Sequence, residues 1–213
     1  MPEKSQLRAH FKEERNKLRD ICLKEGGDWG AAHMTNLSAF LVSELNWSPS
    51  ESTRWPTPWA AYFPIGSELN LLGHASMGNC WLPLIAPEKK LIWFRWSHDI
   101  CLWNTDSLGL PIPPDTTVRC ALESAPDSPR IVITPCLAVD RRGTRLGYGG
   151  GYYDRLLSEF RDRIFTVACV PKALFLDEIE LPRMEHDMPV DLIVTETDTF
   201  LLSPGKLKKV IEQ

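Results

Sequence analysis

Three short runs of apolar residues limit what this chain can fold into. The longest reads IFTVACV over residues 164–170, and two others cover residues 130–134 and 192–195. Strands that are apolar on both faces are typical of a parallel sheet with helices packed on both sides. Segments with helical spacing separate these runs, so the pattern favours an α/β fold, a three-layer sandwich around a mostly parallel sheet.

The remaining segments fit this alternation. Residues 3–24 predict a helical N-terminus, because Leu7, Phe11, Leu18, Ile21 and Cys22 lie on one stripe. We expect further helices at 28–45, 68–77, 151–161 and 204–212, strands at 59–65, 80–85 and 91–96, and loops at 47–58 and 98–128. With 213 residues the chain is expected to form a single domain over residues 1–213.

Charge and cysteine usage argue against several classes of protein. The net charge of −4 has no basic cluster, so we expect no nucleic-acid partner. None of the six cysteines forms a CxxC pair, which disfavours a zinc or thioredoxin site and fits a reducing compartment. No segment approaches the ~20 apolar residues of a membrane span. We therefore expect a cytoplasmic protein with no membrane partner, and a monomer rather than an oligomer.

A glycine-rich loop is the clearest candidate for a functional site. Gly147, Gly149, Gly150 and Gly151 precede the helix expected at 151–161. A glycine loop that leads into a helix presents free N–H groups to an anion, usually a phosphate, and Arg145 could add a charged contact. The loop is neither a P-loop nor a dinucleotide fingerprint, and a flexible turn remains an equal alternative from the residues alone. Asp154, in the first helical turn, is suited to hold magnesium beside bound phosphates.

The longer string RLGYGGGYYDR is more specific. Together with Pro135, Asp140 and Gly143 it resembles the signature of the 5-formyltetrahydrofolate cyclo-ligase family, with Val139 at a position where phenylalanine is usual. The resemblance implies that the loop binds the triphosphate of ATP through Arg145, Leu146, Gly147, Tyr148, Gly149, Gly150, Gly151, Tyr152 and Tyr153. It also implies that Asp154 binds Mg²⁺, that Tyr152 and Tyr153 lie near the folate, and that Arg145 and Tyr153 take part in catalysis.

The N-terminal helix contributes a basic ridge. At ~100° per residue, Lys4, Arg8 and Arg15 fall within about 40° of one another. A solvated helix face is the simpler interpretation of such a ridge. The family, however, opens with a Lys-x-x-Leu-Arg pattern that Lys4, Leu7 and Arg8 match, which implies that Lys4 and Arg8 contact ATP. Arg15 has no counterpart in that pattern, so the solvated-face interpretation stands for it.

Two further segments resemble the family. The segment 181–191 contains His186-Asp187. Sequence neighbours do not readily orient each other as a catalytic dyad, and an aspartate that caps a turn is the simpler interpretation. By resemblance, Asp187 is a second carboxylate for Mg²⁺ and Asp191 a structural turn residue. In the segment 62–70, the resemblance implies that Glu68 faces the pterin ring and that Phe63 lines the same pocket.

The resemblance weakens between residues 72 and 128. Leu108 and Ile112 stand where the family has an aromatic residue and a glutamate near the folate. The implied activity is ATP-dependent cyclisation of 5-formyltetrahydrofolate to 5,10-methenyltetrahydrofolate, with ATP and 5-formyltetrahydrofolate as small-molecule partners. Two alternatives stay open: a non-catalytic nucleotide- or folate-binding protein, and a sugar-phosphate isomerase or CoA-transferase-like enzyme on a similar scaffold.

Overall fold

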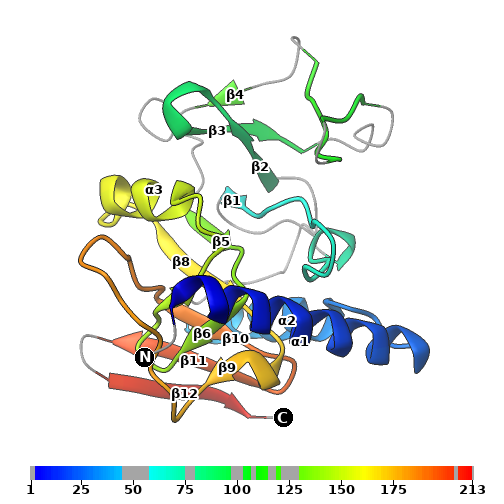
Figure 1. Cartoon of the computed structure of the whole chain (residues 1–213), viewed down its shortest axis with the longest axis vertical. Coiled ribbons are helices and arrows are strands. Elements are labelled where there is room, and N and C mark those ends of the chain that lie inside the picture. The colour runs from blue at the N-terminus through cyan, green and yellow to red at the C-terminus, as the bar shows by residue number, and fades with distance from the viewer. Residues whose placement is uncertain are drawn as a thin grey trace.

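The computed structural model describes residues 3–44, 58–74, 80–96, 103–106, 109–114, 119–120, 130–203 and 206–212. Its α-helices are α1 (Lys4–Lys24), α2 (Ala31–Glu44) and α3 (Tyr152–Phe160). The strands, labelled in Figure 1 where there is room, are β1 (Trp59–Ala60), β2 (Cys80–Ile85), β3 (Leu91–Arg95), β4 (Arg119–Cys120), β5 (Ile131–Thr134), β6 (Ala138–Asp140), β7 (Arg145–Leu146), β8 (Phe165–Cys169), β9 (Phe175–Leu176), β10 (Leu192–Val194), β11 (Asp198–Ser203) and β12 (Lys206–Glu212). Within these parts of the chain, no helix combines the length and the apolar composition that crossing a membrane requires.

The main sheet has nine strands in the order β12-β11-β10-β8-β5-β1-β2-β3-β4. Its five central strands, from β10 to β2, pair in parallel. Antiparallel pairs extend the sheet at both ends. The apolar runs at 130–134, 164–170 and 192–195 supply three neighbouring central strands, so the expected parallel core is confirmed.

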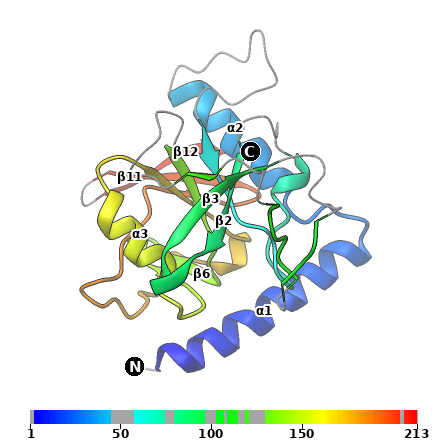
Figure 2. The same ribbon diagram turned by 90° about the horizontal axis from the view of Figure 1, so that it is seen from above.

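Side chains alternate between the two faces of this sheet, as a strand dictates. In β5, Ile131 and Ile133 pack in the cluster that contains α2, whereas Val132 packs with Leu157 and Phe160 of α3. Figure 2 shows α2 on one side of the sheet and α1 on the other. The sandwich is therefore three layers deep, with β5 buried between helices.

A second, three-stranded sheet completes the layer that contains α1 and α3. Its order is β7-β6-β9, and it packs over β8 and β10 in a cluster that also holds Phe11 of α1. This sheet was not expected from the sequence, because its strands have only two or three residues. It places the glycine loop, which follows β7, beside α1.

Two expected helices are wrong. Residues 206–212 form β12, which pairs antiparallel with β11, because this segment ends in the β-branched pair Val210-Ile211 and can extend the sheet edge. Of the helix expected at 68–77, residues 68–71 are not helical, Leu72–His74 makes a 3₁₀ turn, and residues 75–77 lie outside the described part of the chain. The N–H of Asn70 donates instead to the carbonyl of Trp29 at 2.9 Å, so a tertiary contact replaces helical bonding. Within the loop expected at 98–128, residues 119–120 form strand β4.

Candidate functional site

The glycine loop connects β7 to α3 and depends on glycine at two positions. Gly149 has φ 98° and Gly151, the residue before the first turn of α3, has φ 65°. Side chains rarely adopt these left-handed angles, whereas glycine does so freely. The loop therefore directs its backbone towards the N-terminus of α3, the end of a helix that favours anions.

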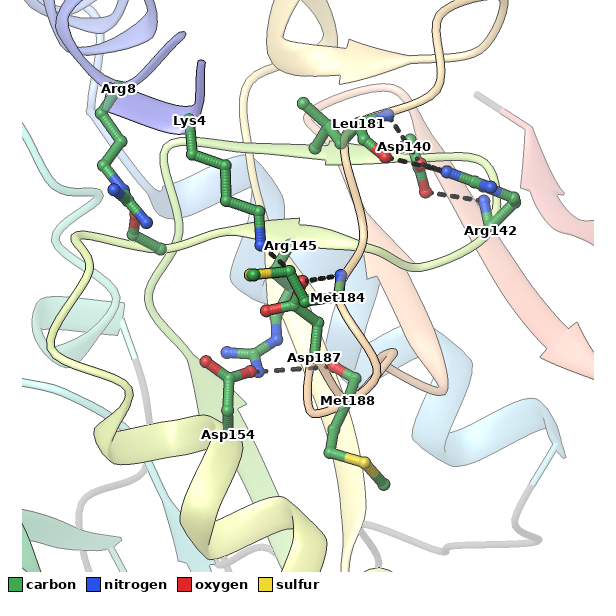
Figure 3. A network of polar contacts seen from close by, with 11 residues as sticks. Lys4, Arg8, Asp140, Arg142, Arg145, Asp154, Leu181, Met184, Asp187 and Met188 are labelled. Atoms are coloured by element: carbon green, nitrogen blue, oxygen red, sulfur yellow. Dashed lines mark hydrogen bonds and ion pairs between the residues drawn. The ribbon is translucent and has the colours of Figure 1, made fainter. Parts of the chain in front are cut away.

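The N-terminal turns of α1 lie against this loop, as expected for Lys4 and Arg8. Nε of Arg8 donates to the carbonyl of Gly147 at 3.0 Å, and Nζ of Lys4 forms an ion pair with Asp187 at 2.5 Å. Figure 3 shows both side chains reaching from α1 towards the loop and the 184–188 segment. Two cations separated from their partners by more than 130 residues are thus brought to one place.

Arg145 and Asp154 form the second ion pair of the site. Nη2 of Arg145 donates to Oδ1 of Asp154 at 2.7 Å, and only 4% of the Arg145 side chain is exposed (Figure 3). The same Nη2 lies 3.4 Å from the carbonyl of Met188. Arg145 therefore joins the start of α3 to the segment that contains Asp187.

The second carboxylate, Asp187, is held by two donors. Besides the Lys4 ammonium, the backbone N–H of Met184 donates to its Oδ2 at 2.6 Å. Burial alone would raise the pKa of Asp187, but these hydrogen bonds outweigh burial, so its pKa lies below the ordinary value. Asp187 is consequently ionised at neutral pH.

These residues line one cavity of about 740 Å³. Its walls come from α1, the glycine loop, one stripe of α3 and the 184–187 segment, and the lining residues are Lys4, Arg8, Arg145, Leu146, Gly147, Gly149, Gly150, Gly151, Asp154, Arg155, Ser158, Glu159, Met184, His186 and Asp187. A cavity of this size suits a small ligand. Cations and loop glycines meet in it, which is the arrangement that a polyphosphate requires.

A second group of predicted residues does not line that cavity. Glu68 is buried, and its Oε2 accepts from the N–H of Ile65 at 2.7 Å. Burial raises the pKa of Glu68, opposed by the Ile65 N–H, a hydrogen bond with the Tyr148 hydroxyl and the charge of Arg15. Tyr148 therefore lies in the glycine loop but directs its hydroxyl to Glu68, away from the cavity.

The other aromatic residues occupy different surroundings. Tyr153 is packed against the apolar cluster under α3, and its hydroxyl has no hydrogen-bond partner among the described residues. Burial, followed by the charge of Glu68, raises the pKa of Tyr153. The ring of Tyr152 lies under the guanidinium of Arg155, 5.4 Å away, and Phe63 packs at the edge of the cluster that contains α2.

Comparison with known proteins identifies the family. A family model described as the 5-formyltetrahydrofolate cyclo-ligase family matches residues 67–196, which is more than half of the sequence. The chain belongs to this family. A 5-formyltetrahydrofolate cyclo-ligase from Escherichia coli (strain K12) is 39% identical over 171 residues, which cover 79% of this chain and 81% of that protein. The resemblance of the RLGYGGGYYDR string is thereby confirmed.

Other relatives differ in how much of them is matched. A mitochondrial 5-formyltetrahydrofolate cyclo-ligase from Arabidopsis thaliana is 34% identical over 82 residues, so the match covers 35% of this chain and spans 30% of that relative's length. Among solved structures, the NMR structure of Aquifex aeolicus 5,10-methenyltetrahydrofolate synthetase superposes with a TM-score of 0.66 at 25% identity. That superposition covers 99% of this chain and 96% of the other. The two proteins therefore share a fold.

Sequence reasoning assigned no binding role to five residues that line the cavity, Arg155, Ser158, Glu159, Met184 and His186, and the surroundings of Arg15 were predicted wrongly. Only 3% of Arg15 is exposed, although a solvated helix face was expected. Its signal was present, since position 15 shares a helix face with Lys4 and Arg8. Burial of that face, however, depends on the loops that fold over α1. Arg19, one turn further on, also reaches a loop, because its Nη1 donates to the carbonyl of Gly66 at 2.9 Å.

Three other sequence expectations have defined outcomes. Asp191 accepts two hydrogen bonds from Arg161 and others from Thr166, which fits a structural role. Leu108 lies outside the described residues, and Ile112 is 45% exposed. The replacement of the family phenylalanine by Val139 leaves a fully buried residue in β6, paired with Phe175 of β9.

Proposed function

We propose that this chain converts 5-formyltetrahydrofolate to 5,10-methenyltetrahydrofolate with the hydrolysis of ATP to ADP and phosphate. The observation that supports this most directly is the double role of the glycine loop. Gly147 and Gly149 line the cationic cavity, while Tyr148 between them bonds to buried Glu68. A nucleotide and a second substrate bound on the two sides of this loop would lie side by side, as a transfer reaction requires.

The cavity is the proposed site of the ATP phosphates. Lys4, Arg8 and Arg145 supply positive charge, and the backbone of residues 146–151 supplies the close approach that glycine permits. Positioning and charge neutralisation are the main contributions that a protein makes to phosphoryl transfer. No protein nucleophile is needed for this role.

The carboxylates of Asp154 and Asp187 fit Mg²⁺. Both line the cavity, and the described residues hold no cluster of three or more His, Cys, Asp and Glu that would form an all-protein metal cage. One or two carboxylates, completed by phosphates and water, are what magnesium takes at such sites. The ion would neutralise phosphate charge. Arg145 and Lys4, which now pair with these carboxylates, would then be available to the phosphate oxygens.

The chemistry explains why ATP is used. An amide oxygen is a poor leaving group, so direct attack of N10 on the formyl carbon is slow. Transfer of the γ-phosphoryl group to the formyl oxygen breaks its bond to ADP and forms an O–P bond. Attack of N10 on the formyl carbon, with loss of its proton, then expels phosphate and closes the methenyl bridge. Arg145 is proposed to stabilise the transferring group, and its burial beside the loop supports this role.

Glu68 is proposed to hold the folate. A carboxylate accepts two N–H bonds from the aminopyrimidine edge of a pterin ring. Phe63, Tyr152 and Tyr153 are the proposed aromatic lining of this pocket. We further propose that the protein is cytoplasmic, in line with its scattered cysteines. We also propose that residues 1–213 form one domain and that the protein acts as a monomer. Size-exclusion chromatography with light scattering tests the monomer.

The deciding experiment follows the absorbance of 5,10-methenyltetrahydrofolate with ATP and MgCl₂ together and with each omitted. We expect product only in the complete mixture. Binding of both substrates without product would instead favour a non-catalytic binding protein, and an absence of ATP binding would favour the isomerase or transferase alternative. Arg145→Met is the matched inactive control, because it removes the charge while keeping a long side chain.

A further inference from the structure

Arg15 holds three loops at once. Its Nε donates to the Ser67 hydroxyl at 3.1 Å, its Nη1 donates to the carbonyl of Cys136 at 3.1 Å, and its Nη2 donates to the Tyr148 hydroxyl. The three acceptors come from the segment after β1, the segment after β5 and the glycine loop. All three nitrogens of one buried guanidinium are therefore used at the ends of different strands.

The charge of Arg15 acts on Glu68, the residue after Ser67. The groups that face this carboxylate come from every neighbouring element. They are Arg15 from α1, Tyr148 from the glycine loop, Tyr153 from α3, Tyr62 and the Ile65 N–H from the segment after β1, and Cys136 from the segment after β5. Of these groups, only Arg15 carries a positive charge. Burial favours protonated Glu68, whereas Arg15 and the Tyr148 hydroxyl favour the carboxylate.

We propose that Arg15 is a positioning residue for the second substrate: its buried guanidinium, hydrogen-bonded to Ser67 and to the Tyr148 hydroxyl, places a positive charge beside the Glu68 side chain and aims Tyr148 at it, so that the pterin ring meets a carboxylate. This inference rests on the proposed function. Arg15 does not line the proposed nucleotide cavity, and its three hydrogen bonds go to Ser67, Cys136 and Tyr148 rather than to either proposed magnesium ligand. Its effect should therefore fall on folate binding and leave ATP binding unchanged.

A purely structural tether makes a different prediction. Removing three hydrogen bonds from a buried arginine would loosen the loops, and folate affinity would fall by the same factor at every pH. Loss of the charge, in contrast, raises the pKa of Glu68 further. Affinity that requires the carboxylate is then lost at a higher pH than in the parent protein. The pH at which binding fails separates the two roles.

The test compares Arg15→Gln with Arg15→Lys. Dissociation constants for 5-formyltetrahydrofolate are measured by isothermal titration calorimetry between pH 5 and 9, without ATP. Loss of the Arg15 charge raises the pKa of Glu68 further. The acid limb, the pH range below which folate affinity falls, should therefore move to higher pH in Arg15→Gln. Arg15→Lys keeps the charge and should restore the parent position. Arg19→Gln is the matched control, since this more exposed arginine on the same helix bonds the carbonyl of Gly66 and the Asp20 carboxylate, and neither Tyr148 nor Ser67.

Two more variants keep the test decisive. Glu68→Gln should remove the acid limb altogether, which shows that Glu68 titrates rather than the ligand. Tyr148→Phe, which leaves Arg15 in place, serves if Arg15→Gln does not fold, and it should move the limb in the same direction, because the Tyr148 hydroxyl also stabilises the Glu68 carboxylate. In turnover, Arg15→Gln should raise the folate KM more at pH 5 than at pH 9, with the ATP KM unchanged at both.

The outcomes distinguish this inference from the function on which it rests. If the parent protein does not bind 5-formyltetrahydrofolate, the proposed function fails. If the parent binds it with an acid limb that Arg15→Gln and Tyr148→Phe leave in place, only the role of Arg15 is refuted. An equal loss of affinity at all pH values in Arg15→Gln and Arg15→Lys would likewise assign Arg15 to tethering alone.

Discussion

Replacing glycine by alanine should lower the stability of the fold at Gly149 and raise it at Gly147, two positions of the same loop. Gly149 has φ 98°, and a Cβ added there would lie 3.2 Å from Cζ of Arg8. Forcing a side chain into the left-handed region costs about 1–2 kcal/mol before any displacement of Arg8. Gly147 has an ordinary φ, and a Cβ there meets nothing within 4 Å. Alanine at Gly147 should therefore stabilise by about 0.4–1 kcal/mol, because it restricts only the unfolded chain.

Differential scanning calorimetry measures both effects. For a chain of this length, 1 kcal/mol corresponds to about 2–4 °C in Tm. We expect Gly149→Ala to lower Tm by about 2–8 °C and Gly147→Ala to raise it by about 1–4 °C. A filter-binding or calorimetric assay should also show weaker ATP binding in Gly149→Ala, since Arg8 must move. Equal Tm changes in the two variants would refute the argument from loop geometry.

Four further changes have defined outcomes. Arg8→Ala should raise the ATP KM about tenfold or more, the worth of a charged hydrogen bond, with the folate KM unchanged as the internal control. Asp154→Asn and Asp187→Asn should each weaken magnesium dependence in a metal titration, with a combined loss clearly below the sum, because both act on one ion; full additivity would separate them. The Lys4–Asp187 pair should stabilise the fold above the unfolded pKa of about 3.9 and lose that effect as the pH falls through the lower folded pKa. In denaturant melts, the stability difference between parent and Asp187→Asn should therefore shrink below about pH 4, and a constant difference would contradict the pair. Asp140→Ala should lower the free energy of unfolding by about 3–5 kcal/mol in the same melts, because removing this fully buried carboxylate leaves several buried donors unpaired. A loss under 1 kcal/mol would contradict this.

The central sheet was predictable because strands buried on both faces have apolar residues at successive positions, a pattern that the sequence shows directly. The runs at 130–134 and 164–170 are apolar at successive positions, and no amphipathic helix or edge strand shows that pattern. The segment at 206–212 has no such signal. It contains Lys206, Lys208 and Lys209, and whether it forms a helix or an edge strand is decided by the neighbouring strand β11. The helix expected at 68–77 failed for the same reason, since contacts with Trp29 override local preference.

Within the site, the loop and the N-terminal cations were predictable and Arg15 was not. Lys4, Arg8 and Gly149 belong to patterns whose spacing is local. Arg15 differs from a solvated arginine only through groups that are 52, 121 and 133 residues away. The division between the cavity side and the Glu68 side of the loop also depends on the folded structure, because Tyr148 and its glycine neighbours face opposite directions.

The contacts of α1 with segments far along the chain have a consequence for folding during synthesis on the ribosome. Lys4 and Arg8 meet partners 183 and 139 residues further along the chain. At ~5–20 residues per second, α1 waits roughly 7–30 s after its emergence before the glycine loop is even translated. During that time its apolar stripe has none of its final neighbours from β6, β7 or β10. Two central strands, β8 and β10, also follow the glycine loop in the chain, so the parallel sheet cannot close before the loop has been made. A product that stops short of the 184–187 segment lacks the partner of Lys4.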